Sequence, residues 1–378
     1  MSTVLESALL PTYPPAPVTF VAGDGVWLVD ADGKRYLDFA AGIAVVGLGH
    51  RHPVPLAAAH AQLDKLWHAS NLFATEPAAA LATKLSERFG GAQAFFCNSG
   101  AEANEAALKY ARKATGKTGV VALSGGFHGR TTGALAATGQ PAKRAAFEPL
   151  LAGVRFAEPN DAASLHAAAG EDVGLILLEP VLGEGGVIPL TPEFAAAAAE
   201  LADELGALLC FDEVQTGIGR TGTFFAWEQL GVKPDLVTLA KALANGLPIG
   251  ALLVADEAAG AFQPGDHGST FGGNPVVCAA ACAVLDTVDD ALLALVREYG
   301  SVLLAGLARF PHVVEARGGG LLVGAQLDVP AAAIVSAALD AGLVCLTSGQ
   351  DVLRLAPPLV VSGAEVDLAL SILSEVLS

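Results

Sequence analysis

The stretch from Ala207 to Lys241 decides the fold, because it holds two apolar runs that each end in a charged residue. The first reads Ala207-Leu208-Leu209-Cys210-Phe211-Asp212, and the second reads Leu236-Val237-Thr238-Leu239-Ala240-Lys241. Continuous apolar runs of this length are typical of strands that are buried on both faces of a parallel sheet. We therefore expect Asp212 and Lys241 at strand ends, where ligands bind in open α/β sheets.

Each of these two charged residues is costly to bury, which points to a chemical use. Burial disfavours the protonated form of a lysine, and a neutral amine can attack a carbonyl, so Lys241 is a candidate Schiff-base former. A buried carboxylate needs a partner, and a pyridinium nitrogen would serve for Asp212. Pyridoxal phosphate (PLP) chemistry requires both groups. For Lys241 taken alone, a solvated lysine at a strand end is the simpler alternative.

The neighbouring sequence alternates strand-like and helical segments. We expect further strands at 94–97, 119–123, 174–178 and 250–254, and helices at 101–114 and 192–205. This alternation predicts an α/β fold with a mostly parallel sheet that is covered by helices on both faces.

The pattern changes near residue 287, which predicts a second, smaller α+β domain. Strands are expected at 320–323, 343–346 and 352–355, and helices at 330–339 and 364–377. Two strands at 26–29 and 36–39 are expected to pack beside this part. We therefore predict a large domain at 51–286 and a small domain formed by 1–50 and 287–378.

Composition excludes several classes of function. The chain has 378 residues and a net charge of −18, which argues against nucleic acid as a partner. No apolar run is long enough to span a membrane, and the start lacks a secretion signal, so a cytoplasmic protein is expected. The five cysteines include no CxxC pair, and no metal site is expected.

Three loops rich in glycine and polar residues follow predicted strands. Segment 98–105 is expected to begin a helix, whose first N–H groups could bind a phosphate. The same sequence is also typical of an ordinary helix N-cap. In segment 124–131, Phe127 can stack on a flat ring and Arg130 can bind a carboxylate. The alternative is that Phe127 is a core residue and Arg130 is a solvated charge. Segment 179–186 holds Glu184 between glycines, and a surface salt bridge is the alternative there.

A competing motif lies at 217–222, where Gly-Ile-Gly-Arg-Thr-Gly matches the G-x-G-x-x-G pattern of dinucleotide-binding proteins. That pattern also needs a helix that starts directly from the glycines and an acidic residue after the next strand. Here Thr-Phe-Phe-Ala-Trp follows, and the next strand ends in Lys241. A dinucleotide-binding oxidoreductase is therefore a distant alternative.

Taken in order, these segments resemble the class III (ω-amino) aminotransferases among the fold type I PLP-dependent transferases, from Asp38 to Pro358. Segments 70–77, 96–105 and 267–275 resemble the acetylornithine aminotransferase subgroup. The resemblance implies a seven-stranded, mostly parallel sheet in the large domain, PLP as cofactor, and a homodimer with shared active sites.

The resemblance also implies a role for each matching residue. Lys241 would carry PLP and move the proton during transamination, while Asp212 would hold the ring nitrogen. The other cofactor-binding residues would be Ser99, Gly100, Ala101, Phe127, Gln215 and, from the other subunit, Thr270. The substrate-binding residues would be Arg130, Ser269, Glu184 and Arg354.

The implied reaction moves the terminal amino group of N2-acetyl-L-ornithine to 2-oxoglutarate, giving N-acetyl-L-glutamate 5-semialdehyde and L-glutamate, a step of arginine biosynthesis. Arg130 would bind the distal carboxylate of either substrate, and Glu184 would neutralise Arg354 until glutamate brings its α-carboxylate. Ala74 stands where ornithine aminotransferases carry tyrosine, which leaves room for an acetyl group. Leu182 departs from the glutamine of many relatives. Ornithine, succinylornithine, succinyldiaminopimelate and 4-aminobutyrate remain alternative donors, and an aminomutase or racemase is disfavoured by Arg354.

Overall fold

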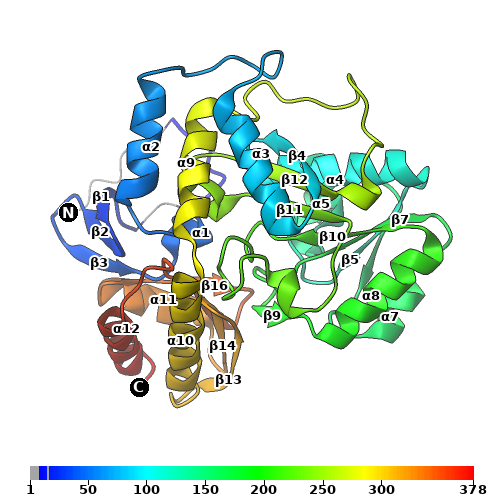
Figure 1. Ribbon diagram of the computed structural model, residues 1–378. Helices are drawn as coiled ribbons and strands as arrows, with labels where there is room; N and C mark the ends of the chain where they lie inside the picture. Colours follow the sequence, from blue (N-terminus) through cyan, green and yellow to red (C-terminus); the bar gives the residue numbers. More distant parts are fainter. Residues whose placement is uncertain (1–7, 15–16) are drawn as a thin grey trace.

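A seven-stranded sheet lies at the centre of the computed structural model, which describes residues 8–14 and 17–378 (Figure 1). Its strands lie in the order β4-β12-β11-β10-β7-β5-β6. Among the described strands of this sheet, β12 alone runs antiparallel to its neighbours. The bounds are β4 (Ala92–Cys97), β5 (Gly119–Leu123), β6 (Val154–Ala157), β7 (Val173–Leu178), β10 (Leu208–Asp212), β11 (Leu236–Leu239) and β12 (Gly250–Ala255).

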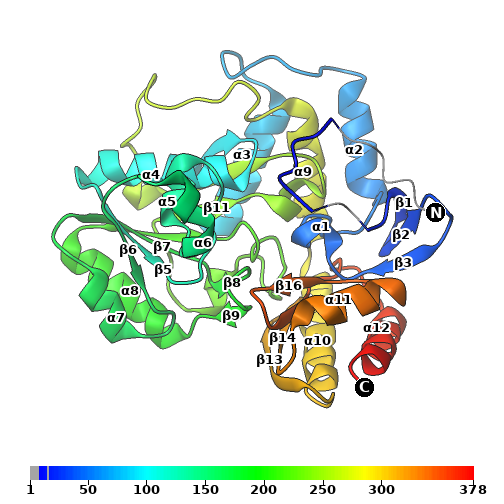
Figure 2. The ribbon, with the colours of Figure 1, turned by 180° about the vertical axis from the view of Figure 1, so that it is seen from behind.

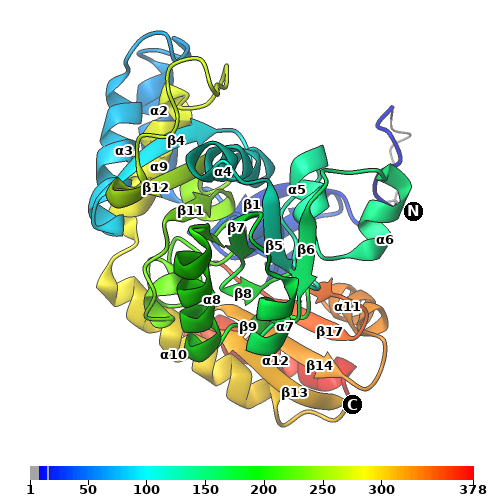
Figure 3. The same ribbon diagram turned by 90° about the vertical axis from the view of Figure 1, so that its right-hand side faces the viewer.

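Side chains that alternate along each strand face two different helical layers. In β10, Cys210 packs toward α4 (Gly100–Thr115), whereas Leu209 and Phe211 pack toward α7 (Ala162–Ala168) and α8 (Pro192–Leu205). Figure 3 shows α7 and α8 together on one side of β5, β6 and β7. The predicted fold class is thus confirmed, with both faces of the sheet covered.

Local signals account for where these helices begin and end. Thr191 caps α8 by accepting a hydrogen bond from Phe194 N, Pro192 stands in the first turn, and Gly206 ends the helix in a left-handed conformation (φ +57°). The expected helix at 192–205 is confirmed residue for residue. β6 was not predicted, because its four residues include an arginine and form a short edge strand.

The remaining helices of this part lie around the same sheet. Helix α9 (Pro275–Thr287) packs against α2 (Pro53–Leu63) and α3 (Glu76–Phe89). The short elements are α1 (Ala41–Ala44), α5 (Thr132–Ala137), α6 (Pro141–Arg144), the 3₁₀ helices η1 (Ala145–Phe147), η2 (Ala226–Gln229), η3 (Lys241–Ala244) and η4 (Asp256–Ala258), and the strand pair β8 (Val181–Leu182) and β9 (Ile188–Pro189).

The C-terminal part forms an antiparallel sheet in the order β13-β14-β17-β16. The bounds are β13 (Val313–Gly319), β14 (Leu322–Leu327), β16 (Leu346–Ser348), β17 (Val352–Leu355), α10 (Asp290–Leu307), α11 (Ala331–Asp340) and α12 (Gly363–Val376). The expected strand at 320–323 was misplaced. Gly320 and Leu321 instead connect β13 to β14, with Gly320 at φ +51°.

The N-terminal strands β1 (Phe20–Asp24), β2 (Trp27–Asp30) and β3 (Arg35–Asp38) form a second small sheet that β15 (Leu343–Val344) completes. Figure 2 shows these strands beside α11 and α12. The single strand expected at 343–346 is therefore wrong, since β15 and β16 belong to different sheets on either side of Cys345.

Val26, Leu37 and Phe39 lie in one apolar core with residues of β14 and β17, as expected for segments that pack together. The domain limits at 51–286, and at 1–50 with 287–378, stay a prediction. Residues 1–7 and 15–16 of that range lie outside the described residues.

Candidate active site

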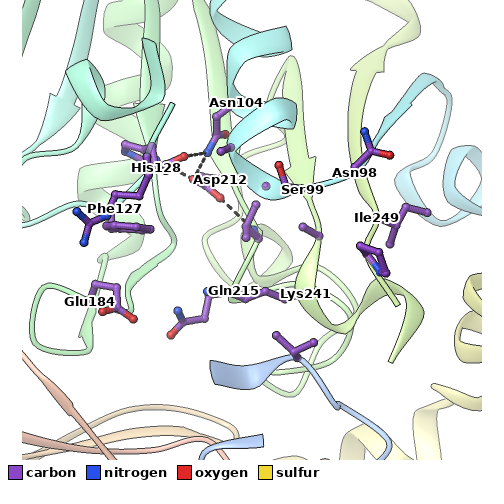
Figure 4. Close-up of a pocket in the computed structure, with 18 of the residues that line it drawn as sticks. Asn98, Ser99, Asn104, Phe127, His128, Glu184, Asp212, Gln215, Lys241 and Ile249 are labelled. Carbon is purple, nitrogen blue, oxygen red and sulfur yellow. Dashed lines mark hydrogen bonds and ion pairs between the residues drawn. The ribbon is translucent and has the colours of Figure 1, made fainter. Parts of the chain in front are cut away.

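A cavity of about 430 Å³ opens at the carboxyl ends of β4, β5, β7, β10 and β11 (Figure 4). It contains cationic and acidic side chains within an otherwise apolar lining. The polar and small residues predicted from the sequence converge there, together with others that were not predicted. The lining includes Asn98, Ser99, Gly100, Ala101, Asn104, Phe127, His128, Arg130, Glu179, Glu184, Asp212, Val214, Gln215 and Lys241.

Lys241 begins η3 directly after β11 and takes a left-handed backbone conformation, with φ +40°. A residue other than glycine in that conformation is strained, and such residues cluster at functional sites. Burial lowers the pKa of its amine to about 8, against the opposing charge of Glu184. Lys241 can therefore lose its proton near neutral pH, as a nucleophile or general base must.

Asp212 is the last residue of β10 and is 3% exposed. Its Oδ1 accepts a hydrogen bond from Val214 N at 3.0 Å. Its Oδ2 accepts one from Asn104 Nδ2 at 2.7 Å and lies 2.7 Å from His128 Nδ1. Figure 4 shows both contacts converging on the carboxylate. These contacts supply the buried carboxylate with the hydrogen-bond partners that it needs.

Asn104 and His128 are contacts that the sequence reasoning missed. Asn104 Nδ2 also donates to His128 O at 2.7 Å, and its Oδ1 accepts from Thr238 Oγ1 at 2.8 Å. The hydrogen bond and charge of Asp212 raise the pKa of His128 above its ordinary value, although burial acts in the opposite direction. The signal that could have found them is their position: Asn104 lies one turn into α4 and His128 lies beside Phe127.

Helix α4 begins at the edge of the cavity. Ser99 caps the helix by accepting a hydrogen bond from Glu102 N at 3.2 Å. The N–H groups of the first helical turn have no acceptor within the helix, so those at Gly100 and Ala101 are available to an anion. A Cβ on Gly100 would lie 2.7 Å from Val214 Cγ1, so this position requires glycine.

Phe127 and Arg130 also line the cavity and contact each other. The Arg130 guanidinium lies 5.7 Å from the Phe127 ring centroid, and Lys143 Nζ lies 4.9 Å from it. Arg130 also lines a neighbouring hollow with Tyr13 and Phe147. The arginine is exposed and can reach an anionic ligand from solvent.

Glu184, which lines the cavity, forms an ion pair with Arg354 behind it. Arg354 is 3% exposed, and its Nη1 donates to Glu184 Oε1, to Gly183 O at 2.8 Å and to Gln215 Oε1 at 3.4 Å. Arg354 lowers the pKa of Glu184, although burial opposes it, so the acid stays ionised. The pairing expected between these two residues is present.

Glu179 was recognised in its loop but given no role. It is 5% exposed, and its carboxylate accepts hydrogen bonds from Phe127 N at 2.7 Å and Gly183 N at 3.3 Å. It therefore ties the loop of Phe127 to the turn that carries Glu184. Burial raises the pKa of Glu179 to about 7, against the charge of His128.

Three predicted residues lie outside the lining of the cavity: Arg354, which contacts Glu184 of the lining, Ser269 and Thr270. Ser269 Oγ accepts a hydrogen bond from Asn98 Nδ2 at 3.1 Å, which places it at the cavity rim. Thr270 is exposed on the same loop. Ala74 lines a different hollow with residues 70–73 and 272–275, and Leu182 is buried in β8.

The glycine motif at 217–222 does not start a helix that could bind a pyrophosphate. It connects the central sheet to the C-terminal part through Arg220, which is 1% exposed. Arg220 Nη1 donates to Leu321 O at 2.9 Å and to Pro357 O at 2.5 Å. A Cβ on Gly320 would lie 2.7 Å from Arg220 O, so the two segments touch through their backbones.

Comparison with known proteins agrees with this geometry. The family model Aminotransferase class-III matches residues 11–377. An acetylornithine aminotransferase of Mycolicibacterium smegmatis is 48% identical over 377 residues, which are 98% of this chain and 96% of the relative. One of Caldanaerobacter subterraneus is 46% identical over 390 residues, covering 100% of this chain and 99% of the relative.

Solved structures agree in fold. The N-acetylornithine aminotransferase of Stenotrophomonas maltophilia has a TM-score of 0.85 and 38% identity, and the match covers 96% of each chain. An ornithine aminotransferase structure from Toxoplasma gondii, with PLP at partial occupancy in its active site, has a TM-score of 0.92 and 31% identity, covering 98% of this chain and 92% of that one. The chain therefore belongs to the class III aminotransferases, which are PLP-dependent enzymes.

Proposed function

We propose that the enzyme transfers the terminal amino group of N2-acetyl-L-ornithine to 2-oxoglutarate, giving N-acetyl-L-glutamate 5-semialdehyde and L-glutamate, as in arginine biosynthesis. The observation that carries this proposal is the Glu184–Arg354 ion pair, of which Glu184 lines the cavity. The acetylornithine aminotransferases that match at 46–48% identity over nearly their whole length support the same donor.

Two cations at different places in the site suit two substrates of different length. Arg130 would bind the carboxylate that lies far from the reacting amine in either substrate. Glutamate also has a carboxylate next to its reacting amine, and Arg354 would take it after Glu184 withdraws. With acetylornithine bound, Glu184 stays on Arg354, so no bare cation faces the methylene chain.

The residues present fit PLP. A cavity of about 430 Å³ has an amine with a lowered pKa, a buried carboxylate on β10 and a helix N-terminus along its lining. Bound PLP would supply an aldehyde that takes up the amino group and a ring that accepts electrons. Ser99, Gly100 and Ala101 would hold its phosphate.

The remaining roles follow from what each side chain can do. Asp212 would hold a proton on the ring nitrogen, Gln215 would bond the ring hydroxyl, and Phe127 would pack on the ring face. Lys241 Nζ would take the proton from the carbon that bears the reacting nitrogen, and would later return it. Ser269 at the rim would contact the substrate.

The test uses the absorption band that PLP has in the purified enzyme. N-acetyl-L-ornithine is added without any keto acid, and 2-oxoglutarate is added afterwards. We expect the first addition to remove the band and the second to restore it. Bleaching by glutamate but not by acetylornithine would discard this donor and keep the aminotransferase; ornithine, succinylornithine, succinyldiaminopimelate and 4-aminobutyrate are then tested in turn.

We also propose that the enzyme is a homodimer whose active sites are shared, with Thr270 completing the phosphate site of the other subunit. Exposed apolar residues near that loop support a second copy as partner. They are Leu66, Trp67, Leu72, Phe73 and Phe271. In the described part of the chain no helix is long and apolar enough to cross a membrane. A cytoplasmic location is part of the proposal.

Phe271→Asp tests the dimer, because it puts a charge on a side chain that is 61% exposed beside Thr270. We expect a monomer by light scattering and a weaker affinity for PLP. Leu295→Asp is the matched control, since Leu295 is 41% exposed on α10. A dimeric Phe271→Asp enzyme with unchanged PLP affinity would contradict the shared site.

A further inference from the structure

One ring nitrogen of His128, Nε2, is buried without a hydrogen-bond partner among the described residues. The residue is 2% exposed, and Nδ1 lies on Asp212 Oδ2. Buried polar atoms without partners are rare and costly, so a group that faces Nε2 must be identified.

The space beside Gly126 points to that group. A Cβ on Gly126 would lie 3.0 Å from Leu123 O and 3.5 Å from both His128 Nε2 and Glu179 Oε1. Three polar atoms therefore surround one small space that glycine keeps open. Two to four polar partners are what a buried water requires.

Glu179 borders this space through its Oε1. Its oxygens already accept the N–H groups of Phe127 and Gly183, and these bonds favour its ionised form. A protonated imidazole would give this buried carboxylate a nearby charge partner, which a buried charge needs. The charged groups that act on the His128 ring are Asp212 and Glu179, whereas Glu179 interacts with His128 and Asp212 and also with Lys241 and Lys143.

We propose that a buried water joins His128 Nε2 to Glu179, and that this network keeps His128 protonated on both ring nitrogens so that Asp212 remains an ionised partner for the cofactor's ring nitrogen. His128 and Glu179 are then positioning residues, since they act through Asp212. The network also places Phe127, whose N–H binds Glu179, relative to Asp212. The proposal depends on PLP as cofactor and not on the identity of the amino donor.

The protonation state of His128 is measured directly by ¹⁵N NMR of histidine-labelled protein without cofactor. His128→Asn identifies the His128 signal among the eight histidines. We expect both ring nitrogens to carry protons at pH 7 in the parent enzyme. In Glu179→Gln the pKa of His128 should fall by about 1 or more, because the opposite charge is lost.

Titration with PLP gives the second readout, by fluorescence of the cofactor-free protein. Asn at position 128 keeps a donor near the place of Nδ1 but removes the positive charge. We expect His128→Asn to bind PLP about tenfold to a hundredfold more weakly. His166→Asn is the control, because His166 is exposed on α7 and its Nδ1 bonds Ala162 O at 2.7 Å.

A neutral His128 at pH 7 in the parent enzyme would overturn the proposal. An unchanged His128 pKa in Glu179→Gln would do the same, even if that variant binds PLP more weakly, because weaker binding alone follows from losing the bonds to Phe127 and Gly183. Neither readout involves acetylornithine, so failure of the proposed donor leaves this test intact.

Discussion

Replacing Glu184 by alanine should change which substrate the enzyme prefers. Arg354 would keep Gly183 O at 2.8 Å and Gln215 Oε1 at 3.4 Å, but it would lose its only carboxylate contact among the described residues. Glutamate would then bind Arg354 without displacing an acid. Acetylornithine would place its methylene chain against a cation that nothing neutralises.

The size of this effect follows from the contact that is lost. A hydrogen bond to a charged group contributes about 1.5–3 kcal/mol, and the lower half applies because the Glu184 side chain is 24% exposed. Since about 1.4 kcal/mol is a factor of ten, the ratio of glutamate to acetylornithine efficiency should rise roughly 10- to 50-fold. Glu184→Gln should move the ratio in the same direction by less.

The assay measures the two half-reactions separately by stopped-flow absorbance of the bound cofactor. Each gives kcat/KM for one amino donor, and their ratio is compared between parent and variant. Glu315→Ala is the control, because Glu315 pairs with Arg317 at 2.6 Å and its side chain is 58% exposed. An unchanged ratio in Glu184→Ala would refute the assignment of Glu184 as the group that neutralises Arg354.

Three further predictions concern the fold and the site, and each is tested by urea unfolding. Gly300→Ala should lower the free energy of unfolding by about 3 kcal/mol, because its Cβ would lie 2.1 Å from the backbone oxygen of Gly320. Gly306→Ala on the same helix is the control. Its Cβ would meet only the movable side chain of Leu370, at 2.7 Å, so this substitution should lower the free energy of unfolding by less than about 1 kcal/mol. Arg220→Lys should cost about 2–4 kcal/mol, since one ammonium cannot reproduce both buried carbonyl contacts; a loss below about 1 kcal/mol would contradict this. In the cofactor-free protein, the pKa of Lys241 is about 8 in the folded state and about 10.4 in the unfolded state. Between these pH values the unfolded state binds more protons, so the free energy of unfolding should rise between pH 8 and 10. Lys241→Met should reduce that rise.

The central sheet could be predicted because its strands are continuous apolar runs that end in polar residues. Asp212 and Lys241 were found in this way, since each follows such a run directly. β13 was missed because Val313–Gly319 contains Glu, Arg and two glycines and has no fully buried residue. Its strand conformation depends on pairing with β14, and the local sequence pattern of residues 313–319 does not predict that pairing.

The network around Asp212 could not be predicted for a related reason. Asn104, His128 and Glu179 lie on three different segments, and each acquires its role only where the strands bring them together. From the sequence alone, a histidine in a glycine-rich loop is expected to be a surface residue, and only the structure reveals that His128 is buried. The roles of Ser269 and Thr270 stay predictions, and that of Thr270 depends on a second subunit.

The split at Cys345 has a consequence for the order in which the chain folds. β15 pairs in parallel with β3, so the N-terminal sheet is completed by residues close to the C-terminus. During synthesis, the edge of β3 that faces β15 stays unpaired until Leu343 and Val344 have left the ribosome, after every strand of the central sheet. Exposed strand edges are where misassembly begins, and pairings this distant in sequence close slowly. The sheet that contains the earliest strands is thus completed only after the central sheet has been made, and until then β3 presents an open edge.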